Sequence, residues 1–225
     1  SGLIYAIAEA LSVTPQDLVN TLIKHLNSMK EVFSTLLNGT VSTEFKNMNE
    51  LTETMRELFI TRSDAISKIS FNNWSELFME LAMIFMNIYV FTFIDDTERG
   101  ETTDLYISDA MKSELMYMQG VGITINEANE SKYLLMIKKK GEYYPIFVTN
   151  PSVYFRTNTP SKKLFSNSDT VVKLLYSLVS SNSIEQANMA GEKTINKDIT
   201  LQIVKEFASS QYKIEKKYTN IPLRF

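Results

Sequence analysis

The chain has 225 residues, a formal net charge of −3, no cysteine and a single histidine, His25. It is long enough to bury a substantial core, and its small net charge creates no global field that would attract nucleic acid or an anionic membrane. The absence of cysteine excludes disulfides, thiolate metal sites and cysteine nucleophiles, and any serine–histidine or histidine-rich metal mechanism would have to use His25.

The first third of the chain is predicted to be helical. Residues 3–11 read as a short apolar helix. Thr14 and Pro15 then provide an N-cap and a first helical residue, and an apolar face continues as far as a stop at Gly39. His25 lies beside this face, where a lone histidine is more often a packed or surface residue than a ligand.

A further helix is expected to open at Ser42 or Thr43 and to continue as far as Phe59. Its apolar face includes Met48 and Met55. Methionines at this spacing suit a core stripe, which we favour, or an adaptable binding groove.

The stretch from residue 74 to residue 94 is the most apolar part of the chain, and we expect the rest to be built around it. Apolar residues first recur at helical spacing, and a β-branched and aromatic run follows from residue 88, so the pattern predicts a buried helix capped by Asn73 and then a core strand. The expected helical stripe contains Leu77, Leu81, Ile84, Phe85 and Ile88. A membrane span is disfavoured because Glu76 and Glu80 would face hydrocarbon, at a cost of roughly a few kcal/mol each.

Asp95, Asp96 and Glu98 follow the predicted strand. They would suit a metal or acid–base cluster, but charges at the end of a strand more often solvate a turn, and we favour the turn. Residues 104–129 carry mixed signals, with glycines at 120 and 122 that break any long helix.

A β-hairpin is expected next, with strands at residues 133–137 and 143–148 joined by a charged turn. Pro145 lacks a backbone donor, so the second strand should lie at an edge or be distorted there.

The remaining sequence alternates between loop and helix. Residues 150–167 read as a loop, Ser168 and Asp169 open a helix, residues 180–191 read as a polar linker, residues 198–209 as a last helix and residues 212–218 as extended chain. The predicted class is therefore α+β, with helices packed on a small mixed sheet and a closing β-hairpin.

Three segments, in this order, resemble the ovarian-tumour-type (OTU) domains, papain-like cysteine proteases that cleave ubiquitin chains. Residues 1–7 look like the opening of the first core helix of the family, residues 73–91 like its tryptophan, helix and core strand, and residues 133–146 like its closing hairpin. The divergent OTU-like domains of large DNA virus proteins look closest, because their hairpins often read Tyr-x-Pro-Ile. The resemblance covers roughly residues 1–150. It implies an OTU-like domain at residues 1–180, with residues 181–225 as a linker and appendage.

The catalytic residues of that family are missing from this chain. Gly2 occupies the nucleophile position. The histidine position is filled by Glu142 in the alignment we prefer, or by Tyr143 if the hairpin slides by one residue. Neither version can form a thiolate–imidazole pair, so the resemblance implies a pseudoenzyme with no catalytic residues, no metal and no cofactor.

The first functional hypothesis is an inert OTU-like module for protein interaction or scaffolding within a larger viral protein, located in the host-cell cytoplasm or the virion. Its partner would be another domain of the same polypeptide or a ubiquitin-like protein, and no membrane is expected. We expect an intracellular chain because no apolar leader with a cleavage site is visible. The candidate binding residues are Trp74, Tyr143, Tyr144, Lys138, Lys139 and Lys140.

Two alternatives remain open. Lysine clusters at residues 138–140, 162–163 and 216–217 are interleaved with aromatic residues, which would suit a nucleic-acid-associated module of a viral transcription or replication factor. A structural piece of a capsid assembly is the third hypothesis.

Overall fold

The computed structural model describes residues 2–60, 71–95, 104–120, 131–149, 161–185 and 212–214. Its elements in chain order are α1 (Gly2–Leu11), α2 (Pro15–Ser28), the 3₁₀ helices η1 (Lys30–Ser34) and η2 (Leu36–Gly39), α3 (Thr40–Glu44), α4 (Met48–Ile60), α5 (Trp74–Met86), β1 (Ile88–Ile94), β2 (Asp104–Tyr106), α6 (Asp109–Gly120), β3 (Lys132–Lys139), β4 (Glu142–Thr149), β5 (Ser161–Lys162), β6 (Phe165–Ser166), α7 (Thr170–Glu185) and β7 (Tyr212–Ile214). The predicted mixed class is confirmed.

The sheet has the strand order β2-β1-β3-β4-β5, with β6 added to β3 and β7 added to β4. Strands β1 and β3 are parallel and pair along their whole common length, whereas β2, β4 and β6 are antiparallel to their neighbours. Both central strands are continuous apolar runs because the sheet is covered on both faces.

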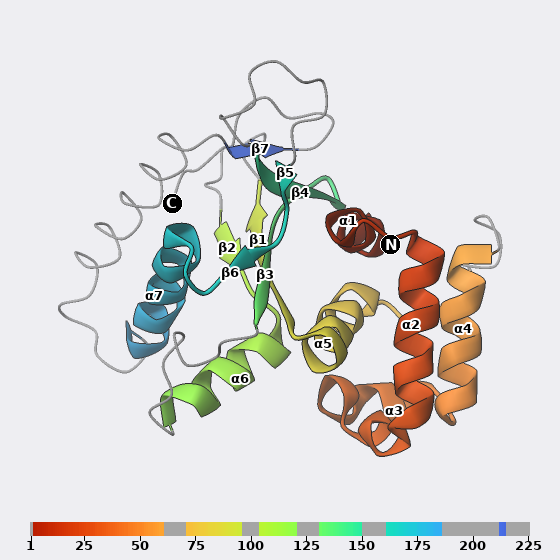
Figure 1. Ribbon diagram of the computed structural model, residues 1–225. Helices are drawn as coiled ribbons and strands as arrows, with labels where there is room; N and C mark the ends of the chain where they lie inside the picture. The colour runs from red at the N-terminus through yellow and green to blue at the C-terminus, as the bar shows by residue number, and fades with distance from the viewer. Residues whose placement is uncertain are drawn as a thin grey trace.

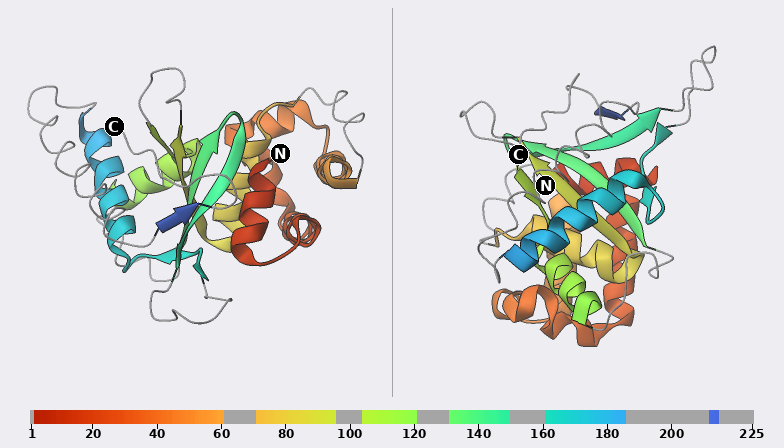
Figure 2. Two further views of the ribbon diagram at one scale, coloured as in Figure 1. Left: turned by 90° about the horizontal axis from the view of Figure 1, so that it is seen from above. Right: turned by 90° about the vertical axis from the view of Figure 1, so that its left-hand side faces the viewer.

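Helices lie on both sides of this sheet (Figure 1). The N-terminal helices α1 to α5 cover one face, and α6 and α7 cover the other; the view from above shows the same division (Figure 2). Alternate residues of β1 and β3 supply the two cores. Val90 and Leu134 belong to the core shared with the N-terminal helices, and Phe91 and Leu135 to the core shared with α6 and α7.

Helix α2 begins as predicted and ends much earlier than predicted. Thr14 accepts a hydrogen bond from the Asp17 backbone N–H at 3.1 Å, and Pro15 is the first helical residue. The helix stops at Ser28, whose hydroxyl donates to the carbonyl of His25, and two 3₁₀ turns then lead to Gly39. The apolar spacing had suggested one helix because the 3₁₀ turns still place Phe33 and Leu37 against the first core.

The predicted helix from Ser42 or Thr43 is in fact two helices, α3 and α4. Phe45 is extended and separates them. The Asn47 side chain accepts the Glu50 N–H at 3.0 Å, and the Glu50 carboxylate accepts the Lys46 N–H at 2.6 Å. This reciprocal capping begins a new helix and is the signal that the periodicity analysis missed.

The most apolar stretch of the chain, residues 74–94, forms the predicted helix and strand, α5 and β1. Helix α5 ends at Asn87, which adopts a left-handed conformation (φ 54°) and accepts a hydrogen bond from the Ser131 hydroxyl at 3.2 Å. Two details differ from the prediction. Asn73 stands at the N-cap position but makes no side-chain capping bond, and Ile84 of the expected stripe is 39% exposed. No helix within the described ranges is long and apolar enough to cross a membrane.

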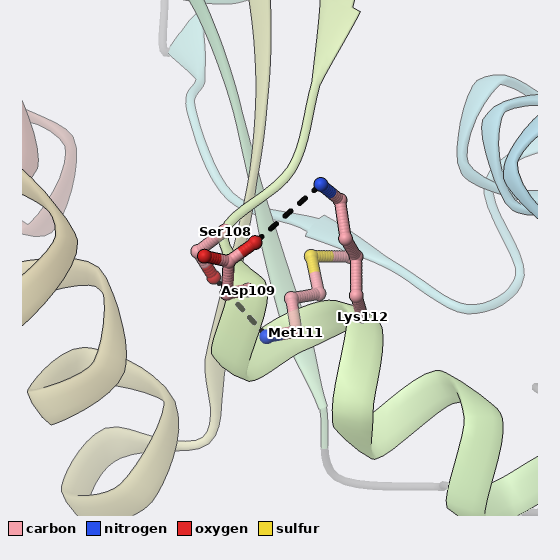
Figure 3. A network of polar contacts seen from close by, with 4 residues as sticks. All are labelled: Ser108, Asp109, Met111 and Lys112. Atoms are coloured by element: carbon pink, nitrogen blue, oxygen red, sulfur yellow. Dashed lines mark hydrogen bonds and ion pairs between the residues drawn. The ribbon is translucent and has the colours of Figure 1, made fainter. Parts of the chain in front are cut away.

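The region with mixed sequence signals contains β2 and α6. Ser108 caps α6, because its hydroxyl oxygen accepts the Met111 backbone N–H at 3.1 Å (Figure 3). Asp109 in the first turn forms an ion pair with Lys112 at 3.5 Å (Figure 3). Serine followed by aspartate was a usable start signal.

The hairpin is confirmed. Strands β3 and β4 are joined by a two-residue turn in which Lys140 and Gly141 both have positive φ, 50° and 79°, as a type I′ turn requires. Pro145 pairs with Met136 on the inner side of β4. On the other side of β4, the pairing with the described residues of β7 begins at Ile146.

The C-terminal third keeps the predicted helix and adds short strands. Helix α7 starts beside Asp169, whose carboxylate accepts the Ser166 N–H at 2.7 Å, and it continues to Glu185, into the stretch predicted as linker. Strands β5 and β6 lie where a loop was expected. Strand β7 falls within the predicted extended stretch and pairs with β4. The predicted helix at residues 198–209 and the connection around residues 63–70 lie outside the described residues.

Candidate functional site

The N-terminal end of α1 abuts the beginning of β4. A β-carbon built on Gly2 would lie 3.6 Å from the backbone nitrogen of Tyr143 and 3.7 Å from the α-carbon of Glu142. These are ordinary van der Waals distances. The start of α1 and the start of β4 are therefore in contact.

The sheet register decides which hairpin side chains share a face with α1. Tyr143 pairs with Lys138, and its ring packs against the core that contains α1, with the Lys138 ammonium 5.3 Å from the ring centre. Tyr144 packs against the opposite core, and its hydroxyl donates to the carboxylate of Glu142. Tyr143, and not Glu142, thus presents its side chain on the face that Gly2 adjoins.

The lysines near the hairpin have partners of their own. Lys139 lies 3.4 Å from the carboxylate of Asp95, whose side chain is only 2% exposed. Lys163, between β5 and β6, lies 3.9 Å from Glu9 of α1 and also faces the ring of Phe147. Asp95 is therefore a buried ion-pair partner, and the prediction that it solvates a turn is wrong.

Among the described residues, the junction holds neither a thiol nor an imidazole. Gly2 has no side chain, and Tyr143 is a phenol. His25 stacks on Phe85 of α5 with ring centres 5.3 Å apart, so it packs between helices, as expected of a lone histidine. Asp96 and Glu98 lie outside the described residues, and within the described ranges no group of three or more His, Asp or Glu side chains could hold a metal ion.

Trp74 is a core residue. It is 9% exposed and makes edge contacts with Phe71 and Phe45 and a stacked contact with Phe78. The structure therefore places this candidate binding residue in the interior, where it supports the start of α5.

A hollow of about 270 Å³ between α5, η2 and α6 was not foreseen. Glu76, Glu80 and Asp109 line it together with Asn38 and Asn73. Burial raises the pKa of Glu80. The pKa of Glu76 is also raised, mainly by burial and in addition by the nearby Asp109 carboxylate. Glu76 and Glu80 stand four residues apart on α5, opposite its apolar stripe, but the sequence does not show that Asp109 joins them.

Glu80 also fixes the conformation of η2. Its carboxylate accepts the Leu37 backbone N–H at 2.7 Å. Leu37, Asn38 and Gly39 all have positive φ, which is unfavourable for leucine by about 1–2 kcal/mol. The carboxylate thus satisfies a donor in a strained turn.

Substitutions at Glu80 should separate its charge from its role as an acceptor. Because the folded-state pKa is raised, the folded chain binds this proton more tightly than the unfolded chain, and stability falls as pH rises from about 4.5 through the folded pKa. Glu80→Gln keeps an acceptor and removes the charge, so it should be at least as stable as the parent at pH 7. Glu80→Ala should lose about 1 kcal/mol because the Leu37 N–H loses its partner.

Urea denaturation at pH 7 and pH 4 measures both effects. Glu76→Gln is the matched control, because it removes a carboxylate with a raised pKa from the same helix while the Leu37 N–H keeps its bond to Glu80, and it should be stabilising at pH 7. Equal losses in Glu80→Gln and Glu80→Ala would contradict this account.

Three tyrosines in the second core are held as neutral phenols. The rings of Tyr89 and Tyr133 stack with centres 5.5 Å apart, and burial raises the pKa of both and of Tyr176. A phenol whose pKa is raised is a poor nucleophile or base near neutrality, so these tyrosines support the core of β1, β3 and α7.

The fold and the junction define a layered domain of helices and mixed sheet in which a helix N-terminus meets a β-hairpin. No protein-family model matches the sequence, and a search of the curated proteins found no relative.

Proposed function

We propose that this chain is a catalytically inert, OTU-like module with a papain-like arrangement, which acts in protein interaction or scaffolding within a larger viral protein. The observation that carries the proposal is the contact between Gly2, at the N-terminus of α1, and residues 142–143 of the hairpin. A papain-like mechanism requires a thiolate and an imidazole at such a junction. Here a glycine and a tyrosine occupy it.

The register favours the alignment in which Tyr143 takes the histidine position, and the alternative with Glu142 is weaker. The Glu142 carboxylate is bonded to Tyr144. An aromatic ring beside a lysine side chain, as in the Tyr143–Lys138 pair, suits a binding surface. The partner would be another domain of the same polypeptide or a ubiquitin-like protein, in the host-cell cytoplasm or the virion.

The nucleic-acid alternative is less well supported by the described lysines of the clusters at residues 138–140 and 162–163. Lys139 and Lys163 are paired with carboxylates, and Lys138 lies over Tyr143. A surface that binds the nucleic-acid backbone needs cations available for phosphates. If the chain had such a surface, its affinity for a single-stranded oligonucleotide would fall steeply with salt concentration. We instead expect weak binding that does not depend on salt.

The proposal is tested by incubating the chain with linked ubiquitin chains and, separately, by titrating it with mono-ubiquitin. We expect no cleavage, because the junction contains neither a thiol nor an imidazole. Chemical-shift changes confined to the hairpin and α1 would support a retained interaction surface. Turnover that a point change in this chain abolishes would defeat the proposal.

A further inference from the structure

A second hollow, of about 350 Å³, lies on the helical side of the molecule, away from the hairpin. It is formed by η1 and by the connection between α3 and α4. Its lining residues are Lys30, Phe33, Lys46, Asn47, Met48 and Asn49. Among the described residues no carboxylate lines it, although the chain as a whole carries a net charge of −3.

The two lysines at this hollow differ from those at the hairpin. Lys139 and Lys163 have carboxylate partners, whereas for Lys30 and Lys46 no side-chain ion pair is found within the described part of the chain. Both residues are exposed. Their ammonium groups are therefore available to an anionic partner.

The carboxylate of Glu50, in the first turn of α4, is engaged with the backbone. Glu50 turns back to accept the Lys46 backbone N–H at 2.6 Å, and the side chain of Asn47 accepts the Glu50 N–H. The charged side chains that line the hollow itself are therefore the two lysines, which complement a negatively charged ligand.

The floor of the hollow is apolar and held in place. Met48 is 7% exposed and belongs to the first core, and Phe33 packs against that core. A preformed apolar floor flanked by two cations complements a ligand that carries an apolar side chain between negative charges. Inorganic phosphate provides only the charges.

We propose that this hollow is a docking site for an acidic peptide segment of a partner protein, with an apolar side chain against Phe33 and Met48 and flanking carboxylates at Lys30 and Lys46. The proposal depends on the hollow alone. It stands or falls independently of the OTU-like function, because the hairpin and Gly2 take no part in it.

The probe is a capped peptide with one leucine between two pairs of glutamates, titrated into the full chain and followed by NMR. We expect shift changes at the hollow. The double change Lys30→Glu and Lys46→Glu should weaken binding by roughly tenfold or more, because two attractions become repulsions. Lys173→Glu, on α7 across the sheet, is the matched control for charge and should leave the affinity unchanged.

Further arms identify the ligand chemistry. A peptide with serine in place of leucine should bind several-fold more weakly, and inorganic phosphate should not compete at equal concentration. If the double charge reversal fails to fold, Lys30→Gln with Lys46→Gln removes the attraction without adding repulsion and should still weaken binding. Absence of binding, equal weakening by Lys173→Glu, or equal binding of phosphate would overturn the proposal.

Discussion

Replacing Lys139 with methionine should lower the free energy of unfolding by about 3 kcal/mol. This value is at the low end of the range for breaking a buried ion pair, because the Lys139 side chain is itself partly exposed. The change leaves the Asp95 carboxylate, 2% exposed, without the ammonium 3.4 Å away. The loss is measured by urea denaturation, with an unchanged dependence on urea as the sign that only stability changed.

A double-mutant cycle isolates this pair. Lys139→Met removes the ammonium group beside the Asp95 carboxylate, and Asp95→Asn removes the negative charge of that carboxylate. The free energy of unfolding of the double variant should therefore be about 2 kcal/mol higher than that of Lys139→Met alone. Lys173→Met, on the exposed face of α7, is the control for loss of a lysine and should change stability by no more than about 0.5 kcal/mol. Strict additivity in the cycle would show that Asp95 and Lys139 do not stabilise each other.

The same pair illustrates what sequence can and cannot predict. The helix–strand unit at residues 74–94 and the hairpin were predictable because their periodicity and turn chemistry are local. The burial of Asp95 was not, because it depends on Lys139, which is brought near by the parallel pairing of β1 and β3. In the sequence, a charged residue at the end of a strand looks the same whether it lies in a buried ion pair or in a solvated turn.

Long-range contacts also explain the errors in the helices and short strands. Leu37 leaves the predicted helix for a left-handed turn that Glu80, far along the chain, stabilises. The two-residue strands β5 and β6 exist only through pairing with β4 and β3, and two residues carry no alternation to detect. Tertiary context overrides propensity in each case.

The candidate site was only partly accessible to sequence analysis. That Gly2 meets the hairpin followed from the resemblance, whereas the choice of Tyr143 over Glu142 needed the register of β3 and β4. The Lys30–Lys46 hollow was missed because it combines η1 with a break between helices that the periodicity concealed.

Installing a thiol and an imidazole at the junction should create a reactive cysteine. A side chain at Gly2 has room, since its β-carbon would meet only ordinary contacts, and the thiol would be the only one in the chain. In Gly2→Cys with Tyr143→His, the helix N-terminus and the imidazole both favour the thiolate. We expect the thiol pKa to fall to about 5 in the double variant and by less in Gly2→Cys alone.

The rate of alkylation by iodoacetamide between pH 5 and pH 9 reads out this effect. At pH 6 an ordinary thiol is only about 0.3% thiolate, so a pKa near 5 raises the thiolate fraction about 300-fold. Lower nucleophilicity offsets this by about 40-fold, which leaves a net rate gain of roughly eightfold over an exposed Ser177→Cys control in the middle of α7. If the thiol of the double variant instead titrates like that of the control, Tyr143 does not occupy the position of a proton acceptor. The papain-like interpretation of the junction would then lose its support, although α1 and β4 would still be in contact.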